Sequence, residues 1–267
     1  MSSRQEQSQV GLTDGFLRLL GVGELAPATI PFDPGYDPVT VEAHLEQSGQ
    51  LMAMLKLSMA TWIVAREDST RRKLAKAHEV GVPVVTGGGP FEIASARGVL
   101  PRYLDLCAEL GFARIEAGEG FTELAVAPEA VVGMAREREL EVTFELGKKH
   151  GGSFTPKGVA SLVDQGRRWL DAGAVQLVVE ARESASDVGL FSSDGTLSGD
   201  LADRFADEFG LATVVFEAPT KPSQFALLDR FGSGVLLTNV RLEELLRVEI
   251  YRRGLHADAF HQTQAPR

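Results

Sequence analysis

Three aliphatic segments decide the fold of this chain: VTFELGKK at 142–149, VQLVVEARES at 175–184 and TVVFEAPTK at 213–221. Each contains a run of apolar, mostly β-branched residues that ends at a glutamate, and each leads into a segment of helical character. Five further short apolar runs along the chain are followed by helical segments in the same way. Eight such units predict an α/β fold of one domain, a (β/α)8 TIM barrel, whose active sites lie at the carboxyl ends of the strands.

The expected strands and helices divide the chain into a barrel and two ends. Strands are predicted near 28–32 and at 52–58, 80–89, 112–120, 140–147, 174–181, 212–217 and 235–239. Helices are predicted over 67–79 and 155–171, the second with Thr155 as its cap and Pro156 in its first turn. We expect an N-terminal extension at 1–22, the barrel at 23–255 and a C-terminal tail at 256–267. Residues 1–10 should be mobile, and 11–22 should form a short helix that closes the barrel bottom.

Composition favours a soluble cytoplasmic protein whose partner is a small solute. The length of 267 residues is close to the roughly 250 of one such barrel. A net charge of −10 and a pI near 5.1, with no basic stripe, argue against nucleic acid and anionic membranes as partners. The chain has one cysteine and no apolar run near the ~20 residues of a membrane span. The polar N-terminus has no signal-peptide core, so we expect a cytoplasmic location.

Alternation along the strands indicates which side chains share the barrel mouth. Residues two apart in a strand point to the same face, so Lys149 rather than Lys148 shares the face of Glu145. The rim then gathers carboxylates among cations, which suits an anionic substrate and a hard divalent cation. Mg²⁺ is the expected metal because oxygen ligands dominate and no His/Cys cluster is present. The same rule pairs other strand-end residues: Lys56 with Ser58, Glu180 with Arg182, and Glu217 with Pro219 and Lys221.

Each of these residues also has a structural interpretation. The three strand-end glutamates could be paired with Lys149, Arg182 and Lys221 without any catalytic role, and Lys56 could be buried against a carboxylate. The glycines at 87–89 form a tight turn in one interpretation and an anion cradle in the other. The five histidines are scattered along the sequence, and His150, beside the GKK segment, is the best catalytic candidate among them.

Several segments in barrel order resemble the phosphosulfolactate synthase family, whose members add sulfite to phosphoenolpyruvate in coenzyme M biosynthesis. The resemblance covers roughly residues 40–260. It implies a Mg²⁺-dependent (β/α)8 enzyme that forms a homo-oligomer and takes a small anionic, phosphoenolpyruvate-like substrate. The matching segments are MLKLS, VVTGGGPFE, YLDLCAELGFARIE, ELGKK, DAGAVQLVVEARES with GLF, VVFEAPTKPSQ and EIYRRGL with Asp258.

The chain departs from the family pattern in the loops of its first half. Asp33-Pro34-Gly35 stands where the family has Asp-Lys-Gly, and Ser58-Met59-Ala60-Thr61-Trp62 follows the strand-two lysine where the family has Trp-Gly-Thr-Ser. The family's Gly-Gly-Thr is Gly87-Gly88-Gly89 here, and its Ser-Asp-Gly is Gly118-Glu119-Gly120. This pattern fits a changed substrate, a lost activity or neutral drift.

The resemblance and the alternation together assign roles. Sulfite attack at C3 of phosphoenolpyruvate creates an enediolate that must be protonated at C2, and Lys149 is the expected acid. Lys56 is expected to bind sulfite or the substrate carboxylate. The metal is assigned to Glu145, Glu180, Glu217 and Asp33, and substrate binding to Arg182, Lys221, Asn239, Gly88 and Gly89.

Two other functions remain open at this stage. One is a lyase or transferase that uses a different nucleophile or a related phosphorylated or carboxylated substrate. The other is a non-catalytic barrel that acts as a binding protein.

Overall fold

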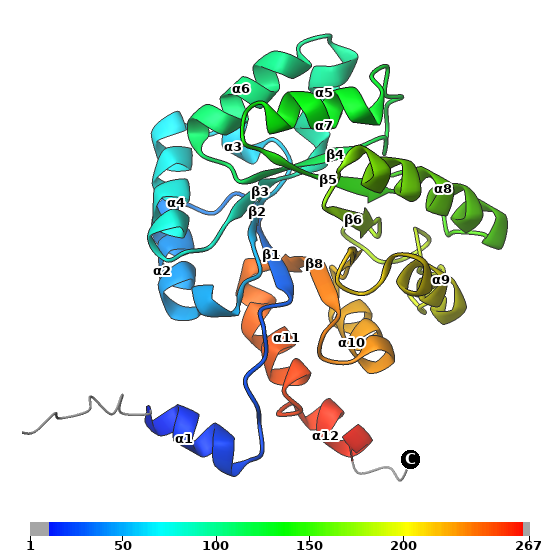
Figure 1. Cartoon of the computed structure of the whole chain (residues 1–267). Coiled ribbons are helices and arrows are strands. Elements are labelled where there is room, and N and C mark those ends of the chain that lie inside the picture. The colour runs from blue at the N-terminus through cyan, green and yellow to red at the C-terminus, as the bar shows by residue number, and fades with distance from the viewer. Residues whose placement is uncertain (1–10, 264–267) are drawn as a thin grey trace, which may run out of the picture.

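The computed structural model describes residues 11–263, and at its centre eight parallel strands close into a barrel in chain order (Figure 1). This confirms the predicted (β/α)8 fold, and every strand overlaps its predicted position. The strands are β1 Thr29–Asp33, β2 Leu55–Leu57, β3 Val84–Thr86, β4 Arg114–Gly118, β5 Glu141–Leu146, β6 Gln176–Val179, β7 Val214–Glu217 and β8 Leu236–Arg241.

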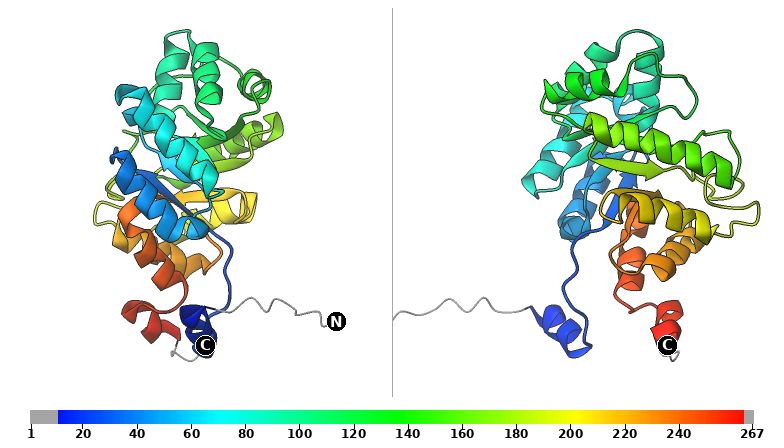
Figure 2. Two further views of the ribbon diagram at one scale, coloured as in Figure 1. Left: turned by 90° about the vertical axis from the view of Figure 1, so that its left-hand side faces the viewer. Right: turned by 45° about the vertical axis from the view of Figure 1, so that its right-hand side comes forward.

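Helices surround this barrel on its outside (Figures 1 and 2). The helix predicted over 67–79 is α4, Glu67–Glu79, and the one predicted over 155–171 is α8, Pro156–Ala172. Thr155 caps α8 as expected, because its hydroxyl oxygen accepts the amide of Gly158 at 3.1 Å, and Pro156 occupies the first position. The other helices are α2 Pro38–Ser48, α3 Thr61–Val64, α5 Gly88–Ala96, α6 Leu100–Leu110, α7 Pro128–Arg136, α9 Gly199–Phe209, α10 Lys221–Phe231 and α11 Leu245–Arg252, with short 3₁₀ turns at Gly49–Leu51 and Leu242–Glu244.

The barrel interior is filled in layers. Near the amino ends of the strands, an apolar cluster of Ile30, Met54, Val85, Val178 and Val215 fills the barrel. Because side chains two apart share a face, the next inward positions on these strands lie one layer higher. Charged side chains occupy much of that layer, so the apolar plug forms the floor beneath them.

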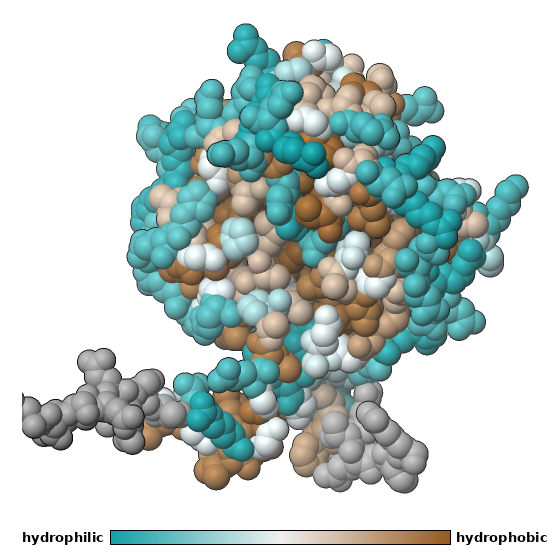
Figure 3. All heavy atoms as spheres, viewed as in Figure 1, coloured by the Kyte–Doolittle hydropathy of each residue, from teal (hydrophilic) through white to brown (hydrophobic). Residues whose placement is uncertain are grey.

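The two ends of the described chain differ from expectation. Leu12–Leu19 forms helix α1, as predicted, but it does not close the barrel bottom, because none of its residues is buried. Leu12, Phe16 and Leu19 are exposed, and Figure 3 shows brown surface over this helix. The predicted tail contains α12, Ala257–Thr263. The expectation for 1–10 lies outside the described residues, and within residues 11–263 no helix has the length and hydropathy to cross a bilayer.

A buried ionic network joins the first strand to the last barrel helix where the barrel closes between β1 and β8. Thr29 Oγ1 donates to Glu249 Oε1 at 2.8 Å, and Arg252 donates to Glu249 Oε1 at 3.2 Å and to Thr29 Oγ1 at 3.1 Å. Arg252 also donates to the carbonyl of Val235 at 3.0 Å. The network therefore ties β1, α11 and the start of β8 together.

We expect Glu249→Ala to lower the free energy of unfolding by about 3–5 kcal/mol, because it leaves the buried Arg252 without its carboxylate. Urea denaturation measures this change. The control is Glu67→Ala, which breaks an exposed pair with Arg71 and should cost less than about 1 kcal/mol. Equal losses in the two variants would contradict the role of the network.

Candidate active site

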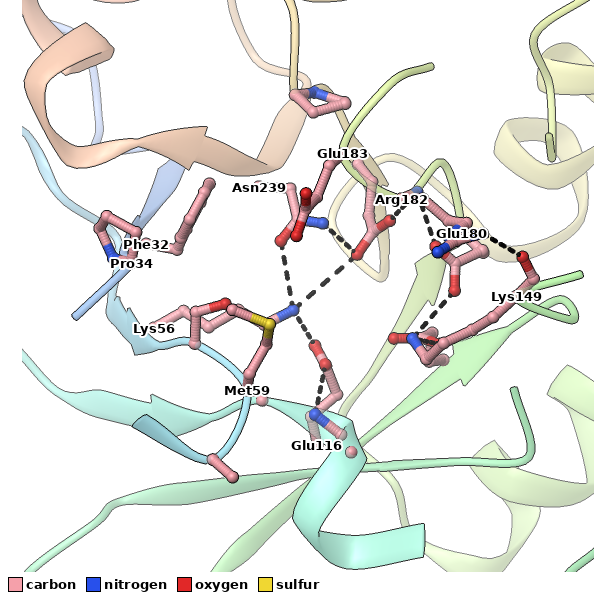
Figure 4. A pocket seen from close by; sticks show the side chains of 18 of the residues that line it. Phe32, Pro34, Lys56, Met59, Glu116, Lys149, Glu180, Arg182, Glu183 and Asn239 are labelled. Carbon is pink, nitrogen blue, oxygen red and sulfur yellow. Dashed lines mark hydrogen bonds and ion pairs between the residues drawn. The ribbon is translucent and has the colours of Figure 1, made fainter. Parts of the chain in front are cut away.

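A cavity of about 640 Å³ opens at the carboxyl ends of the strands. It holds most of the side chains that the sequence singled out, and residues from all eight βα units contribute to it (Figure 4). The charged and amide side chains that line it are Lys56, Glu116, Glu145, Lys149, Glu180, Arg182, Glu183, Glu217, Asn239 and Arg241.

Lys56 lies at the base of the cavity among acceptors from three other strands. Its ammonium donates to Glu116 Oε2 at 2.8 Å and to Asn239 Oδ1 at 3.5 Å, and lies 3.9 Å from Glu217 Oε1. Figure 4 shows Glu116 and Asn239 on opposite sides of the Lys56 nitrogen. Because Lys56 is buried, these contacts replace the water that a charged amine requires.

Lys149 forms a second cluster on the opposite side of the cavity. Its ammonium donates to Glu145 Oε1 at 2.9 Å and to Glu180 Oε2 at 3.1 Å. Alternation places Lys149 on the face of Glu145 only if β5 continues, but the strand ends at Leu146 and the chain turns at Gly147, whose φ is 128°. The side chain nevertheless returns to Glu145, whereas the neighbouring Lys148 donates to a backbone carbonyl and is exposed.

Glu217 is held by the chain that follows β6. Its Oε2 accepts the amides of Ala181 and Arg182 at 2.7 and 2.9 Å, and its Oε1 accepts the side-chain amide of Asn239 at 2.6 Å. Asn239 has a φ of 54°, a conformation that asparagine adopts more readily than most residues. Its amide therefore positions Glu217 and Lys56 in this arrangement.

Burial and neighbouring charges set the protonation of both clusters. Burial, followed by the charge of Glu180, raises the pKa of Glu145 to about 7 although Lys149 opposes the shift. Burial alone would lower the pKa of Lys56 and Lys149, but the surrounding carboxylates outweigh it and the pKa of each ammonium is raised. Burial also raises the pKa of the other three carboxyl groups, Glu116, Glu180 and Glu217.

Glu116 is a site residue that the sequence analysis missed. It lies on β4 in the segment FARIEAGEG, where Ile115 and Ala117 point to the outer core and Glu116 points inward. Its Oε1 accepts the amide of Gly88 at 2.9 Å, at the start of α5. The alternation rule that selected the other strand-end carboxylates also applies to Glu116.

Two predicted site residues lie away from the cavity lining. Asp33 alternates with Phe32 and Pro34, which line the cavity, and its carboxylate instead accepts Lys73 at 2.6 Å and the amide of Tyr36 at 2.6 Å. Lys221 begins α10 and pairs with Asp258 at 3.0 Å. The structure therefore does not bring the predicted metal ligand Asp33 or the predicted substrate-binding Lys221 into the cavity.

The remaining predicted residues lie at the rim. Gly88 and Gly89 line the cavity at the first turn of α5. Arg182 donates to the carbonyl of Lys149 at 3.1 Å and lies 3.5 Å from His150 Nδ1. Among the described residues no ion pair joins the Arg182 guanidinium to a carboxylate, so its charge is available to an anion.

Metal donors in the cavity are hard oxygens, the type that Mg²⁺ prefers. Among the described residues, the buried cavity carboxylates are Glu116, Glu145, Glu180 and Glu217, and they face Lys56 and Lys149. Two negative charges are therefore uncompensated when every one of these groups is ionised. Within residues 11–263 no three acidic, histidine or cysteine side chains already have the arrangement of a metal site. Donor chemistry and charge therefore fit a divalent cation, while the lysines hold the carboxylates in this structure.

A (β/α)8 barrel with titratable groups gathered in a cavity at its strand ends has the architecture of an enzyme. Residues 27–258 match the family model described as ComA, (2R)-phospho-3-sulfolactate synthase. The chain belongs to the phosphosulfolactate synthase family.

The sequences of three relatives from this family align with this chain over most of their length. The phosphosulfolactate synthase of Methanocaldococcus jannaschii is 30% identical over 233 residues, covering 87% of this chain and 93% of the relative. That of Methanothermobacter thermautotrophicus is 28% identical, covering 86% and 90%, and that of Bacillus subtilis is 22% identical, covering 87% and 91%.

Solved structures support the fold alone. KGPDC from Streptococcus mutans has a TM-score of 0.53 at 12% identity, covering 89% of this chain and 97% of the other. The YdjI aldolase from Escherichia coli K12 has a TM-score of 0.54 at 12% identity, covering 90% and 91%.

The raised pKa of Glu145 predicts a pH-dependent stability. A carboxyl that binds its proton more tightly when folded destabilises the fold as the pH rises from its ordinary value of 4.5 to about 7. Glu145→Gln keeps a neutral side chain, so its stability relative to wild type should rise by about 1–3 kcal/mol between about pH 5 and about pH 8.

Urea denaturation of both proteins at the two pH values, in buffer with a chelator, measures this difference. The exposed Glu123→Gln serves as the control and should follow the wild-type pH profile. A Glu145→Gln profile parallel to wild type would show that Glu145 does not titrate in this window.

Proposed function

We propose that this protein adds sulfite to C3 of phosphoenolpyruvate and forms phosphosulfolactate. The family match supports this reaction, and the observation that carries it is the pair of lysine–carboxylate clusters, built on buried carboxyl groups, in one strand-end cavity. The reaction joins an anionic nucleophile to an anionic substrate, so it needs cations beside the reacting atoms and a proton donor.

The bond changes define what the side chains must do. The sulfite sulfur forms a bond to C3 while the C2–C3 double-bond electrons move onto the C2–carboxylate unit as an enediolate. A proton then adds at C2, and the phosphate ester stays intact. The site must therefore stabilise negative charge on the carboxylate and deliver one proton.

In this proposal Lys149 delivers the proton to C2, and Glu145 then returns a proton to Lys149. The two groups are 2.9 Å apart. The enediolate is a strong base, so an ammonium with a raised pKa can still protonate it. Glu145, with a pKa of about 7, is suited to exchange protons with solvent near neutral pH.

Anion binding is assigned to groups at the rim and the base of the cavity. Arg182, whose guanidinium donates to the backbone carbonyl of Lys149, binds the phosphate together with the first turn of α5 at Gly88 and Gly89. Lys56 binds sulfite or the substrate carboxylate, and Asn239 positions Lys56. Lys221 is not part of this proposed site.

A divalent cation completes the proposal. Mg²⁺ would be held by Glu180 and Glu217, which leaves Glu145 free to exchange protons, and would supply positive charge that stabilises the substrate carboxylate as the enediolate forms. The excess of buried carboxylates over buried ammonium groups supports it.

The alternatives make different demands on the site. A binding barrel does not need buried carboxylates whose pKa values are raised, and such groups are typical of catalytic sites. A different nucleophile or a related substrate needs the same acid and the same metal. A panel of nucleophiles offered with phosphoenolpyruvate and read by mass spectrometry separates that alternative from sulfite addition.

Lys149→Met should lower kcat for sulfite-dependent loss of phosphoenolpyruvate by about 10²–10⁴-fold with little change in KM. It should also remove deuterium incorporation at C2 in heavy water. Lys148→Met, the matched control, should have a small effect. Similar small effects of both substitutions would exclude Lys149 as the acid, and a large rise in KM alone would make it a substrate-binding group.

Metal binding can be measured without turnover. Mn²⁺, used in place of Mg²⁺, should bind the wild-type protein in an electron paramagnetic resonance titration, and Glu180→Gln should bind it at least about tenfold more weakly because a carboxylate ligand is lost. The exposed Glu123→Gln should bind Mn²⁺ as wild type does. Unchanged affinity in Glu180→Gln would remove that residue from the metal site.

A further inference from the structure

The cavity is divided by polarity between the two halves of the barrel. Among the described residues, nine charged side chains line the cavity, and seven of them come from the β5–β8 half of the barrel. The large apolar side chains of the cavity come from the β1–β4 half, and Figure 4 shows two of them, Phe32 and Met59, across the cavity from Lys149 and Arg182. These apolar side chains are Phe32, Met59, Ile93 and Phe121.

Three of these apolar side chains are open to solvent at the cavity mouth. Met59 is 51% exposed, Ile93 50% and Phe121 46%. They come from three successive βα units, and they converge on one cavity. Exposed apolar side chains gathered beside a polar pocket are typical of a surface that binds a ligand.

The backbone holds Met59 in a conformation that costs free energy. Its φ is 51°, which a non-glycine residue adopts only under constraint from its surroundings. Gly87 permits this arrangement, because a Cβ there would lie 2.7 Å from the Met59 amide nitrogen. The close packing of the two loops therefore places Met59 at the mouth.

A buried carboxylate holds Phe121 in place. Glu92, on α5, is fully buried, and its Oε2 accepts the amides of Phe121 and Thr122 at 2.9 Å each. The same oxygen accepts the Thr122 hydroxyl at 3.0 Å. Glu92 is thus a positioning residue for the loop that carries Phe121.

We propose that Met59, Ile93 and Phe121 form an apolar subsite, through which the site accepts, besides phosphoenolpyruvate, an enol phosphate with an aromatic or branched aliphatic substituent. This rests on the proposed function for the identity of the anionic head, which the β5–β8 half binds. The cavity of about 640 Å³ lies in the ~300–1,000 Å³ range of pockets that enclose drug-sized ligands. Phosphoenolpyruvate and sulfite are much smaller and occupy only the charged half.

Methylphosphonate and phenylphosphonate test the subsite, since they carry the same anionic head and differ in their apolar group. Isothermal titration calorimetry should show phenylphosphonate binding at least about tenfold more tightly to the wild-type protein. Ile93→Ala/Phe121→Ala should reduce this ratio towards one without weakening methylphosphonate. Glu92→Ala should lower the ratio in the same direction, and Leu19→Ala, an exposed apolar change on α1, should leave it unchanged.

Equal affinities for the two phosphonates, no detectable phenylphosphonate binding, or a ratio that survives the double substitution would overturn the subsite. Circular dichroism of each variant separates a lost subsite from a lost fold. The proposed reaction fails independently: a normal phosphonate ratio with no sulfite-dependent loss of phosphoenolpyruvate would retain the subsite and reject sulfite addition.

Discussion

The ion pair between Lys56 and Glu116 is the interaction on which the cavity depends. Both side chains are buried, on β2 and β4, with their charged atoms 2.8 Å apart. Neither charge could remain there alone, because burying an unpaired ion costs several kcal/mol. Glu116 also receives the amide of Gly88 at the start of α5, and Lys56 lies beside Glu217 and Asn239. The pair therefore couples both halves of the barrel at the base of the site.

Alternation along the strands explains what could be predicted from the sequence. It brought Glu145, Glu180 and Glu217 to one cavity, because they lie at the ends of three strands of a closed barrel. It failed where the backbone left the strand. Lys221 starts a helix that is capped by Thr220, and this directs it towards Asp258. Lys149 reaches the site through a turn rather than through the strand from which it was predicted.

Other features of the site depend on contacts that no local pattern contains. Phe32 faces the cavity and Asp33 faces away from it because of the register of β1. This register could not be predicted from the sequence, because Pro34 and Gly35 directly after the strand interrupt its alternation. The position of Phe121 depends on Glu92, 29 residues earlier in the chain. The division of the cavity into a charged half and an apolar half could not be predicted from any single loop, because each loop contributes only a few side chains. It follows from the arrangement of the eight loops around one axis.

Closure of the barrel has a consequence for synthesis of the chain. β1 pairs with β8, and Thr29 contacts Glu249, 220 residues later. During translation, β1 therefore has an unpaired edge until almost the entire barrel has left the ribosome. An exposed strand edge is a template for association with other chains. The acidic composition of the protein, with a net charge of −10, opposes such association between nascent copies through electrostatic repulsion.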